Sequence, residues 1–243
     1  MNLEGRAALV TGAGRRVGQA IAVGLARAGC DVAVHVHGTV DGGADTAKQV
    51  RALGKRAEAI AADLSDPVAA GALAARAAQV LGGRLDILVN SAAIMVKQAV
   101  PDVTPESWDR TLDLNLRAPF FVTQGALPFL RKARGRVVNL ADDAALEPWP
   151  SYLPHCVSKA GVVMLTRALA RALAPDIAVN AVAPGAVLLP DDWDDATRAH
   201  FAETTPLGRL GSPEDVVSAV LYLLTADYVT GTVLVVDGGR VIR

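Results

Sequence analysis

The sequence predicts an α/β protein, a single doubly wound domain built on a parallel sheet, and three observations support this fold class. Short aliphatic runs without period-two alternation recur along the chain, as in strands that are buried on both faces of a parallel sheet. Longer helical patterns separate these runs, and this alternation is typical of right-handed strand–helix–strand crossovers. The length of 243 residues fits one large domain, 1–243, better than two small ones.

Seven strands and six helices are expected, in alternation. The expected strands are Ala7–Thr11, Asp31–His37, Arg56–Ala61, Leu85–Asn90, Arg136–Leu140, Ile177–Ala183 and Thr232–Val236. The expected helices are Arg16–Ala28, Asp45–Leu53, Pro67–Leu81, Pro105–Leu130, His155–Leu173 and Pro213–Leu224. Three helices have clear starts, because Asp66, Thr104 or Ser212 stands before a proline at the first helical position. The acidic segment Val187–Thr205 is predicted to be an insertion that forms a lid over the substrate.

The composition excludes several classes of protein. Hydrophobic residues make up 51% of the chain, which excludes a disordered protein. Lys and Arg number 24 against 25 Asp and Glu, so no basic excess is available to bind nucleic acid. The apolar runs are far shorter than the roughly 20 residues of a membrane span, and the first residues do not resemble a signal peptide. With only Cys30 and Cys156, a cytoplasmic protein without disulfides is expected, and residues at metal-ligand spacing do not occur.

A glycine-rich turn joins the first expected strand to the first expected helix. It reads Thr11-Gly12-Ala13-Gly14-Arg15-Arg16-Val17-Gly18. Glycines allow a tight turn and let the backbone approach a pyrophosphate, while the start of the helix supplies N–H donors and partial positive charge. The sequence therefore predicts a dinucleotide-binding turn whose contacts come from Gly12, Gly14, Arg15, Arg16, Val17 and Gly18.

The turn and several further motifs resemble those of short-chain dehydrogenases/reductases over nearly the whole chain. The turn follows the TGxxxRxG variant of the pteridine reductases, with Arg16 where the superfamily usually carries a glycine. The other matching segments are Asp63-Leu64, Asn90-Ser91-Ala92-Ala93, Leu114-Asn115-Leu116, Val179–Gly185 and Tyr228–Gly239. The resemblance implies a Rossmann-type domain whose seven-stranded parallel sheet has the order 3-2-1-4-5-6-7, with helices on both faces. It also implies cofactor contacts by Asp63, Leu64, Asn90, Ala92, Lys159, Pro184, Gly185 and Val187.

The second expected strand indicates which nicotinamide cofactor is bound. Folds that select NAD carry a carboxylate at the end of this strand to bind the ribose 2′-hydroxyl, but here no carboxylate stands before Asp41. A guanidinium suits a 2′-phosphate, and a histidine does not repel it. The resemblance implies that Arg16, His37 and Thr39 hold this phosphate, so NADP(H) is predicted. Gly38 replaces a second arginine of that group, and the arginines of the turn have the alternative interpretation of solvated residues at a helix start.

The catalytic positions depart from the superfamily pattern. Its members carry a Tyr and, four residues later, a Lys on one helix face, with a Ser 13 residues before the Tyr and an Asn on the preceding helix. When Ser158-Lys159-Ala160 is matched to the family's SKA, the lysine is Lys159 and the helix asparagine is Asn115, which is implied to hold a water in the proton relay. His155 then occupies the Tyr position, and Asp142 occupies the Ser position, where pteridine reductases also have Asp.

Three interpretations of His155 are open. It is the working acid and base, because an imidazole with a reference pKa near 6.5 is a better acid than a phenol near 10. It binds a polar substrate while Asp142 or water supplies the proton. Or it marks a protein that binds NADP(H) but reduces carbonyls poorly, since an imidazole reaches roughly 2 Å less far and about 1 Å of misplacement costs on the order of 10²-fold. Lys159 disfavours the imidazolium, and pairing with Asp142 favours it.

Substrate contacts are expected in the loops after the fourth, fifth and sixth strands. Met95 stands where pteridine reductases stack an aromatic residue on pterin, and Trp149, Tyr152 and Trp193 are further candidates. The sequence therefore predicts an NADP(H)-dependent oxidoreductase that transfers hydride to or from a carbonyl or C=N group of a small, pterin-like or polar cyclic substrate. The alternatives are a cofactor-binding protein with a structural or regulatory role, and a dehydratase or isomerase that uses the same site.

The resemblance also implies a homo-oligomer, a tetramer or a dimer. Such proteins usually pair through the helices that match Pro105–Leu130 and His155–Leu173 and through the C-terminal strand. The second of these helices is rich in small residues, which suits close packing between helices, although burial within one subunit would explain much of this.

Overall fold

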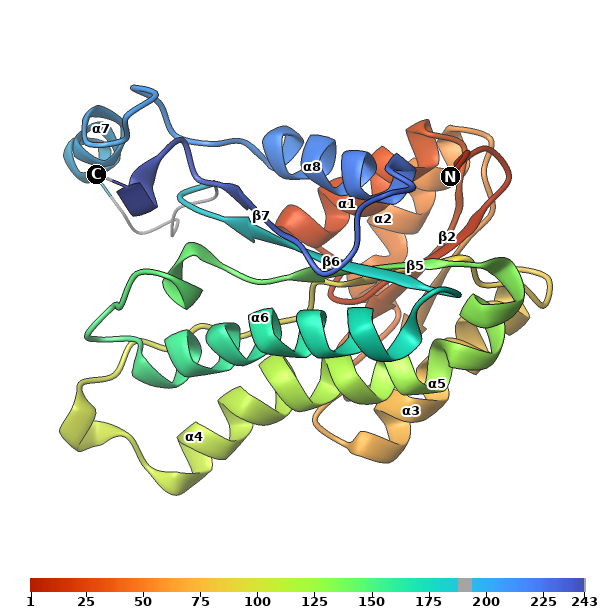
Figure 1. Ribbon diagram of the computed structural model, residues 1–243, viewed down its shortest axis with the longest axis horizontal. Coiled ribbons are helices and arrows are strands. Elements are labelled where there is room, and N and C mark those ends of the chain that lie inside the picture. Colours follow the sequence, from red (N-terminus) through yellow and green to blue (C-terminus); the bar gives the residue numbers. More distant parts are fainter. Residues whose placement is uncertain (188–193, 243) are drawn as a thin grey trace.

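A seven-stranded parallel sheet forms the centre of the protein, with helices on both faces (Figure 1). The computed structural model describes residues 1–187 and 194–242. The strands are β1 (Ala7–Val10), β2 (Asp31–Val36), β3 (Ala57–Ala61), β4 (Ile87–Asn90), β5 (Arg136–Leu140), β6 (Ala178–Pro184) and β7 (Val233–Val236), in the order β3-β2-β1-β4-β5-β6-β7. Both the predicted fold class and the predicted strand order are therefore confirmed.

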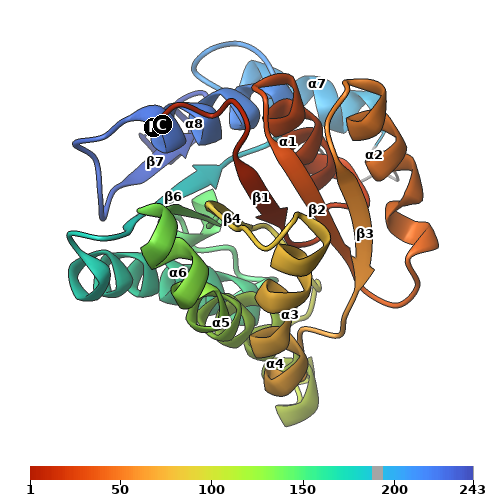
Figure 2. The same ribbon diagram turned by 90° about the vertical axis from the view of Figure 1, so that its right-hand side faces the viewer.

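Eight α-helices are described around the sheet. They are α1 (Arg16–Arg27), α2 (Asp41–Ala52), α3 (Pro67–Val80), α4 (Pro105–Leu112), α5 (Ala118–Ala133), α6 (Leu153–Leu173), α7 (Asp195–Glu203) and α8 (Pro213–Thr225). Figure 2 shows α1, α2 and α8 on one face and α3, α5 and α6 on the other. None of the helices in the described parts of the chain is long and apolar enough to cross a membrane.

Each face of the sheet buries its own aliphatic core. On one face, Ile21 and Leu25 of α1 and Leu223 of α8 pack against strand residues, and all three side chains are at most 1% exposed. On the other face, Leu73 of α3 and Leu130 of α5 are completely buried. Because both faces are covered, the strands carry continuous aliphatic runs rather than alternating ones, which is the pattern that predicts them from the sequence.

The three predicted helix starts are confirmed. The Asp66 side chain accepts a hydrogen bond from the backbone N–H of Val68 at the start of α3. Thr104 and Ser212 each form a capping box with the residue three positions later, at the starts of α4 and α8. These contacts are local in sequence, so the residue types alone were sufficient to predict them.

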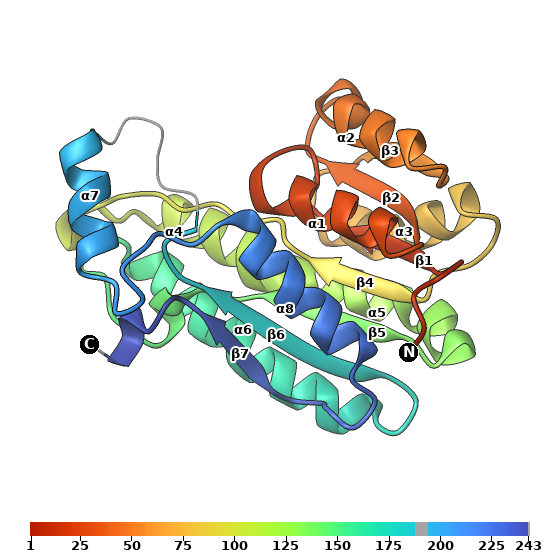
Figure 3. The same cartoon turned by 90° about the horizontal axis from the view of Figure 1, so that it is seen from above.

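Two helices differ from their predicted bounds by more than two residues, and one was not predicted. The long helix expected over Pro105–Leu130 is interrupted by a π-helical turn, Asp113–Arg117, between α4 and α5. The second helix begins at Asp41 rather than Asp45. Its first turn includes Gly42 and Gly43, whose low helix propensity had indicated a later start. Within the predicted insertion, α7 begins at Asp195, where the Asp194 side chain accepts from the N–H of Thr197. Figure 3 shows α7 at the end of the molecule toward which the strands point.

Candidate active site

The predicted site residues come from loops at one edge of the sheet. In a parallel sheet all strands end at the same edge, so segments far apart in sequence meet there. These segments are the glycine-rich turn after β1, His37–Thr39 after β2, Asp63-Leu64 after β3, Asn90–Met95 after β4, Asp142–Tyr152 after β5 and Gly185–Val187 after β6.

The glycine-rich turn packs so closely that its glycines have no room for a side chain. Gly12 has a φ of +65°, and a Cβ placed on it would lie 2.8 Å from the Cα of Ala92. A Cβ on Gly18 would collide with the carbonyl oxygen of Gly12, and one on Gly14 would collide with the carbonyl oxygen of Gly42. The result is a bare backbone concavity before helix α1, which fits the pyrophosphate of a dinucleotide. Arg16 occupies the left-handed region with a φ of +54°, where glycine would be unstrained.

Thr11 connects this turn to the segment after β4. Its hydroxyl oxygen accepts hydrogen bonds from the backbone N–H groups of Ser91 (2.9 Å) and Ala92 (3.0 Å). The sequence marked Thr11 only as part of a motif, and this role was not predicted from it. The Asn90 side chain points into the protein and donates to Asn139 (2.8 Å) and Thr123 (3.2 Å). Any contact between Asn90 and a cofactor would therefore use its backbone rather than its side chain.

The residues predicted to hold a 2′-phosphate lie at the surface. Arg15 and Arg16 are exposed at the start of α1, and His37 and Thr39 are exposed after β2. The Nδ1 atom of His37 is 3.8 Å from a carboxylate oxygen of Asp63, so the predicted phosphate and adenine contacts are neighbours. Hydrogen bonds from Ser65, with a smaller contribution from His37, lower the pKa of Asp63.

Asn115 lies in the π-helical turn between α4 and α5, and this turn aims its amide at the loop after β4. The side-chain oxygen accepts from the N–H of Ile94 (2.8 Å), and the nitrogen donates to the carbonyl of Ile94 (2.9 Å) and to the hydroxyl of Ser158 (3.1 Å). The resemblance implied that Asn115 holds a water, but these contacts give it a positioning role for Ile94. A π-turn at such a place often marks a functional site.

His155 is almost fully buried, at 3% exposure, in the first turns of α6. Its Nδ1 atom is 3.1 Å from the carbonyl oxygen of Ile94 and 3.4 Å from the amide nitrogen of Asn115. Because a carbonyl only accepts, the shorter contact assigns the hydrogen to Nδ1. Its Nε2 atom has no hydrogen-bond partner within the described residues and lies 3.7 Å from a carboxylate oxygen of Asp142. Trp149 stacks on the ring, with 6.4 Å between ring centroids and 17° between planes. The second nitrogen is thereby left available for proton transfer.

Lys159 follows one helical turn after His155, as the predicted pairing requires. Its ammonium donates to the carbonyl of Leu140 (2.8 Å), and the side chain is 4% exposed. Burial lowers the pKa of Lys159, and the Asp142 carboxylate opposes that shift. Burial raises the pKa of Asp142, but the His155 imidazole and the Lys159 ammonium outweigh it and hold that pKa below its usual range. Asp142 is therefore the anion that compensates both neighbours.

Asp143 is a titratable residue of this site that was not predicted from the sequence. Its side chain is 2% exposed, and its Oδ1 atom lacks a hydrogen-bond partner in the described part of the chain. Burial, followed by the neighbouring Asp142 carboxylate, raises the pKa of Asp143 to about 8. At neutral pH the pair therefore consists of an ionised Asp142 and a largely protonated Asp143. The only signal in the sequence was that Asp143 directly follows Asp142, and this does not indicate that the Asp143 side chain is buried.

The predicted substrate residues have mixed positions. Met95 is 46% exposed on the loop after β4. Tyr152 packs edge-to-face on Trp149 at 5.8 Å, so both belong to the aromatic wall beside His155. Val187 is 8% exposed within the aliphatic core, and its side chain is thus a packing residue. Trp193 lies outside the described residues.

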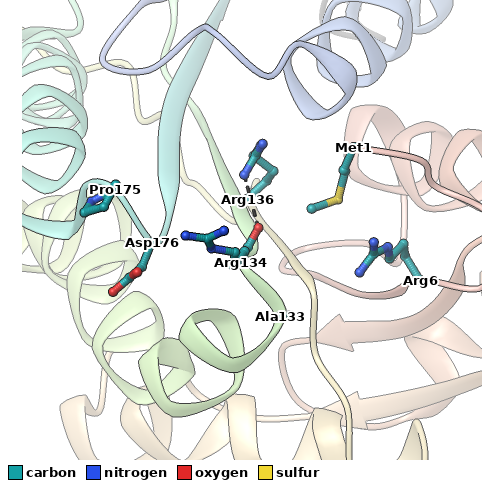
Figure 4. A pocket seen from close by; sticks show the side chains of 7 residues that line it. All are labelled: Met1, Arg6, Ala133, Arg134, Arg136, Pro175 and Asp176. Atoms are coloured by element: carbon teal, nitrogen blue, oxygen red, sulfur yellow. Dashed lines mark hydrogen bonds between the residues drawn. The ribbon is translucent and has the colours of Figure 1, made fainter.

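Two cavities open on the surface of the described part of the protein. One, of about 490 Å³, lies beyond the carboxyl ends of β6 and β7 and includes Val187, Pro206, Leu207 and Val236 in its lining. The other, of about 480 Å³, is at the opposite end of the sheet and is lined by Met1, Arg6, Ala133, Arg134, Arg136, Pro175 and Asp176 (Figure 4). It shares no residue with the predicted site. No group of His, Cys, Asp and Glu within 1–187 and 194–242 is arranged to hold a metal ion.

Comparison with known proteins identifies the family. A family model described as enoyl-(acyl carrier protein) reductase matches residues 12–240. A solved structure of a doubly substituted short-chain dehydrogenase/reductase from Serratia marcescens superposes with a TM-score of 0.91 at 32% identity, over 99% of this chain and 100% of that one. The chain belongs to the short-chain dehydrogenase/reductase superfamily.

Curated short-chain dehydrogenases/reductases cover almost all of the chain. The 3beta-hydroxysteroid dehydrogenase 1 of Eggerthella lenta is 37% identical over 98% of this chain and 94% of its own length. The 2-dehydro-3-deoxy-D-gluconate 5-dehydrogenase of Escherichia coli is 34% identical over 100% of this chain and 98% of its own length. The protein is accordingly an oxidoreductase of this superfamily, which uses a nicotinamide cofactor. Neither relative is named a pteridine reductase, so that subgroup stays a prediction.

The crowded turn gives a direct test of the cofactor site. We expect Gly18→Ala to weaken nicotinamide cofactor binding by at least about 100-fold, because the new methyl group would displace the Gly12 carbonyl by a large fraction of an ångström. Gly71→Ala on α3 is the matched control, since a Cβ there meets no atom within 4 Å. Titration of protein fluorescence with the cofactor measures both affinities. Equal affinities for the two variants would contradict the assignment of the turn.

The raised pKa of Asp143 predicts a pH-dependent stability. The folded protein binds this proton more tightly than the unfolded chain, so stability falls as pH rises from about 4 to about 8. Asp143→Asn removes that loss and should make the protein more stable than wild type by on the order of 2 kcal/mol at pH 8, with no gain at pH 4. Urea unfolding at several pH values measures the difference. Asp176→Asn, at an exposed position, should show no such trend, and a gain for Asp143→Asn that is independent of pH would exclude the assigned protonation.

Proposed function

We propose that the protein is an NADP(H)-dependent oxidoreductase that transfers hydride to or from a carbonyl or C=N group, with His155 as the proton donor and acceptor. The observation that carries this proposal is the unpartnered Nε2 atom of His155, buried beside Asp142 and one helical turn before Lys159. A small cyclic substrate with polar edges, including pterins, suits the aromatic wall formed by Trp149 and Tyr152.

The cofactor site is proposed to use the bare backbone of the glycine-rich turn for the pyrophosphate and Asp63-Leu64 for the adenine. Ala92, Pro184 and Gly185 line the end of the site nearer the catalytic cluster. When bound, the cofactor supplies or accepts the hydride. Lys159 adds a buried positive charge next to that region, held in place by the Leu140 carbonyl.

The proton route follows from the hydrogen bonds of His155. Its Nδ1 atom faces the Ile94 carbonyl, and Asn115 holds Ile94 in place, so rotation of the ring would break its contact with Ile94. In the reduction direction, protonated Nε2 would give its proton to the substrate oxygen or nitrogen as hydride arrives. The Asp142 carboxylate stabilises the imidazolium before transfer, and the buried Lys159 ammonium opposes it.

The preference for NADP(H) is proposed from the residues after β2. No carboxylate occurs between Val32 and Val40, and His37 and Thr39 are exposed beside the start of α2. The arginines at the start of α1 add positive charge on the same edge of the sheet. A 2′-phosphate therefore meets donors rather than the carboxylate that binds a free ribose hydroxyl.

We also propose that the subunits assemble into a tetramer or a dimer. Large apolar side chains are exposed on the outer helices, with Met164 of α6 at 60% and Phe120 of α5 at 37%. Tyr222 of α8 is 55% exposed, and all four residues of the edge strand β7 are only partly buried. A second copy would cover these surfaces.

His155 can be tested with a screen of NADPH consumption over pterins, quinones, imines, ketones and β-ketoacyl thioesters. We expect His155→Ala to lower kcat/KM by about 10²- to 10⁴-fold at unchanged cofactor affinity, because it removes the proton donor but not the cofactor site. Val157→Ala is the control, since Val157 is on the same helix but 43% exposed.

The same screen separates the alternatives. Faster carbonyl reduction by His155→Tyr would show that the site is degraded rather than specialised. A wild-type protein that binds NADPH tightly and turns over no substrate in the panel would instead have a structural or regulatory role.

The cofactor preference has its own test. We expect NADPH to bind at least about tenfold more tightly than NADH, because charge-assisted hydrogen bonds to a phosphate are stronger than neutral ones. Isothermal titration with each cofactor measures the two dissociation constants. Exchanging Thr39 for Asp should reverse the preference, and equal constants in the wild-type protein would refute it.

A further inference from the structure

His35 is a buried histidine that lies outside the catalytic cluster. It is the penultimate residue of β2, and it is 1% exposed. Its imidazole lies between two segments that are separated by some fifty positions in the chain, the glycine-rich turn after β1 and the end of β3. The other buried residues of this strand are Val and Ala, so a buried histidine among them requires a physical reason.

Both ring nitrogens of His35 make hydrogen bonds to the backbone. The N–H of Gly12 donates to Nδ1 at 3.1 Å, and Nε2 lies 3.1 Å from the carbonyl oxygen of Ala62. An amide N–H only donates and a carbonyl only accepts, so the ring must be the neutral tautomer that carries its hydrogen on Nε2. The carbonyl of His35 itself accepts from the N–H of Ala13 at 2.9 Å.

The two partners belong to two different parts of the proposed cofactor site. Gly12 is the first glycine of the turn, held at a φ of +65° against Ala92. Ala62 directly precedes Asp63-Leu64, the proposed adenine contact. Without the imidazole, the N–H of Gly12 would lack its acceptor and the Ala62 carbonyl would lack its donor, so each segment would lose one of its hydrogen bonds to β2.

We propose that His35 is a positioning residue that holds the pyrophosphate turn and the adenine segment in register for cofactor binding. This inference rests on the proposed nicotinamide cofactor site, and it adds a residue that touches neither the cofactor nor the substrate. Because the turn and the adenine segment bind parts common to NADPH and NADH, His35 affects both cofactors equally.

The environment of His35 keeps the ring neutral at physiological pH. Burial lowers the pKa of His35 to about 4, against the opposing effect of the Ala62 hydrogen bond, and the nearby His37 and the Arg76 guanidinium of α3 lower it further. Arg76 itself donates to the Ala61 carbonyl at 2.9 Å. Below this pKa, Nδ1 would carry a hydrogen that faces the N–H of Gly12, so the turn would lose its acceptor. Cofactor affinity should therefore fall as pH decreases from about 5 to about 3.

The test compares His35→Phe, which removes both hydrogen bonds, with His35→Asn, whose side-chain oxygen can still accept from Gly12. Two lost hydrogen bonds should weaken NADPH and NADH binding at pH 7 by about tenfold each in His35→Phe, with kcat at saturating cofactor within about twofold of wild type. His35→Asn should restore part of the affinity. Ile177→Ala is the control for a buried substitution at the other end of the sheet, and it should leave both dissociation constants unchanged.

A pH series supplies a readout that a merely structural role would not move. The wild-type dissociation constant for NADH should rise as pH falls from about 5 to about 3, and His35→Asn should lack this step because an amide does not titrate there. This comparison of the wild-type protein with His35→Asn also tests the positioning role of His35 if His35→Phe does not fold.

The outcomes distinguish the two proposals. If the wild-type protein binds both cofactors, and His35→Phe binds them equally well or Ile177→Ala loses as much affinity, the positioning role is refuted and the cofactor site stands. The positioning role is also refuted if the NADH dissociation constant of His35→Asn rises at low pH as that of the wild-type protein does. If the wild-type protein binds neither NADPH nor NADH, the proposed function itself is refuted, and the role of His35 falls with it.

Discussion

The close approach of backbone to backbone at the glycine-rich turn is the constraint on which the rest of the site depends. The carbonyl of Gly12 occupies the space in which Gly18 would carry a side chain, and the Cα of Ala92 stands in the corresponding space beside Gly12. This contact joins the end of β1 to the start of α1 and to the loop after β4. Because that loop continues to Ile94, which positions His155, the geometry of the turn is linked through one segment to the catalytic cluster.

Charge balance is the second organising principle. Lys159 is buried and would be costly without an anion, and Asp142 supplies it while also facing Nε2 of His155. A second anion in the same place would repel Asp142, and the structure avoids this because Asp143 stays largely protonated near neutral pH. Asp142, Asp143 and Lys159 thus surround the imidazole of His155 with titratable groups whose charges oppose one another. This arrangement is better suited to moving a proton than to stabilising the fold.

If His155 is the proton donor, as we propose, its neighbours have a different task from those around a tyrosine. A phenol needs a neighbouring cation to lower its pKa, whereas an imidazole needs its tautomer fixed and its charged form supported. Ile94 and Asn115 fix the tautomer through the Nδ1 hydrogen bond, and Trp149 covers one face of the ring. The shorter side chain is thereby held in a single orientation, which favours a specialised acid over a degraded site.

The elements that could be predicted from the amino-acid sequence are those whose causes are local. Aliphatic runs specified the strands, and Asp66, Thr104 and Ser212 specified helix starts, because a capping hydrogen bond spans only two or three residues. The resemblance to short-chain dehydrogenases/reductases implied that Asn115, Asp142, His155 and Lys159 belong to one site. The alternation of strand and helix patterns predicted the parallel sheet.

Roles that depend on contacts between distant parts of the chain could be recognised only in the folded protein. The π-helical turn at Asn115, the proton on Asp143 and the bridge made by His35 each require partners from other elements, and burial sets their energies. A residue's exposure and its hydrogen-bond partners are properties of the packed molecule, so no pattern along the chain could have revealed them.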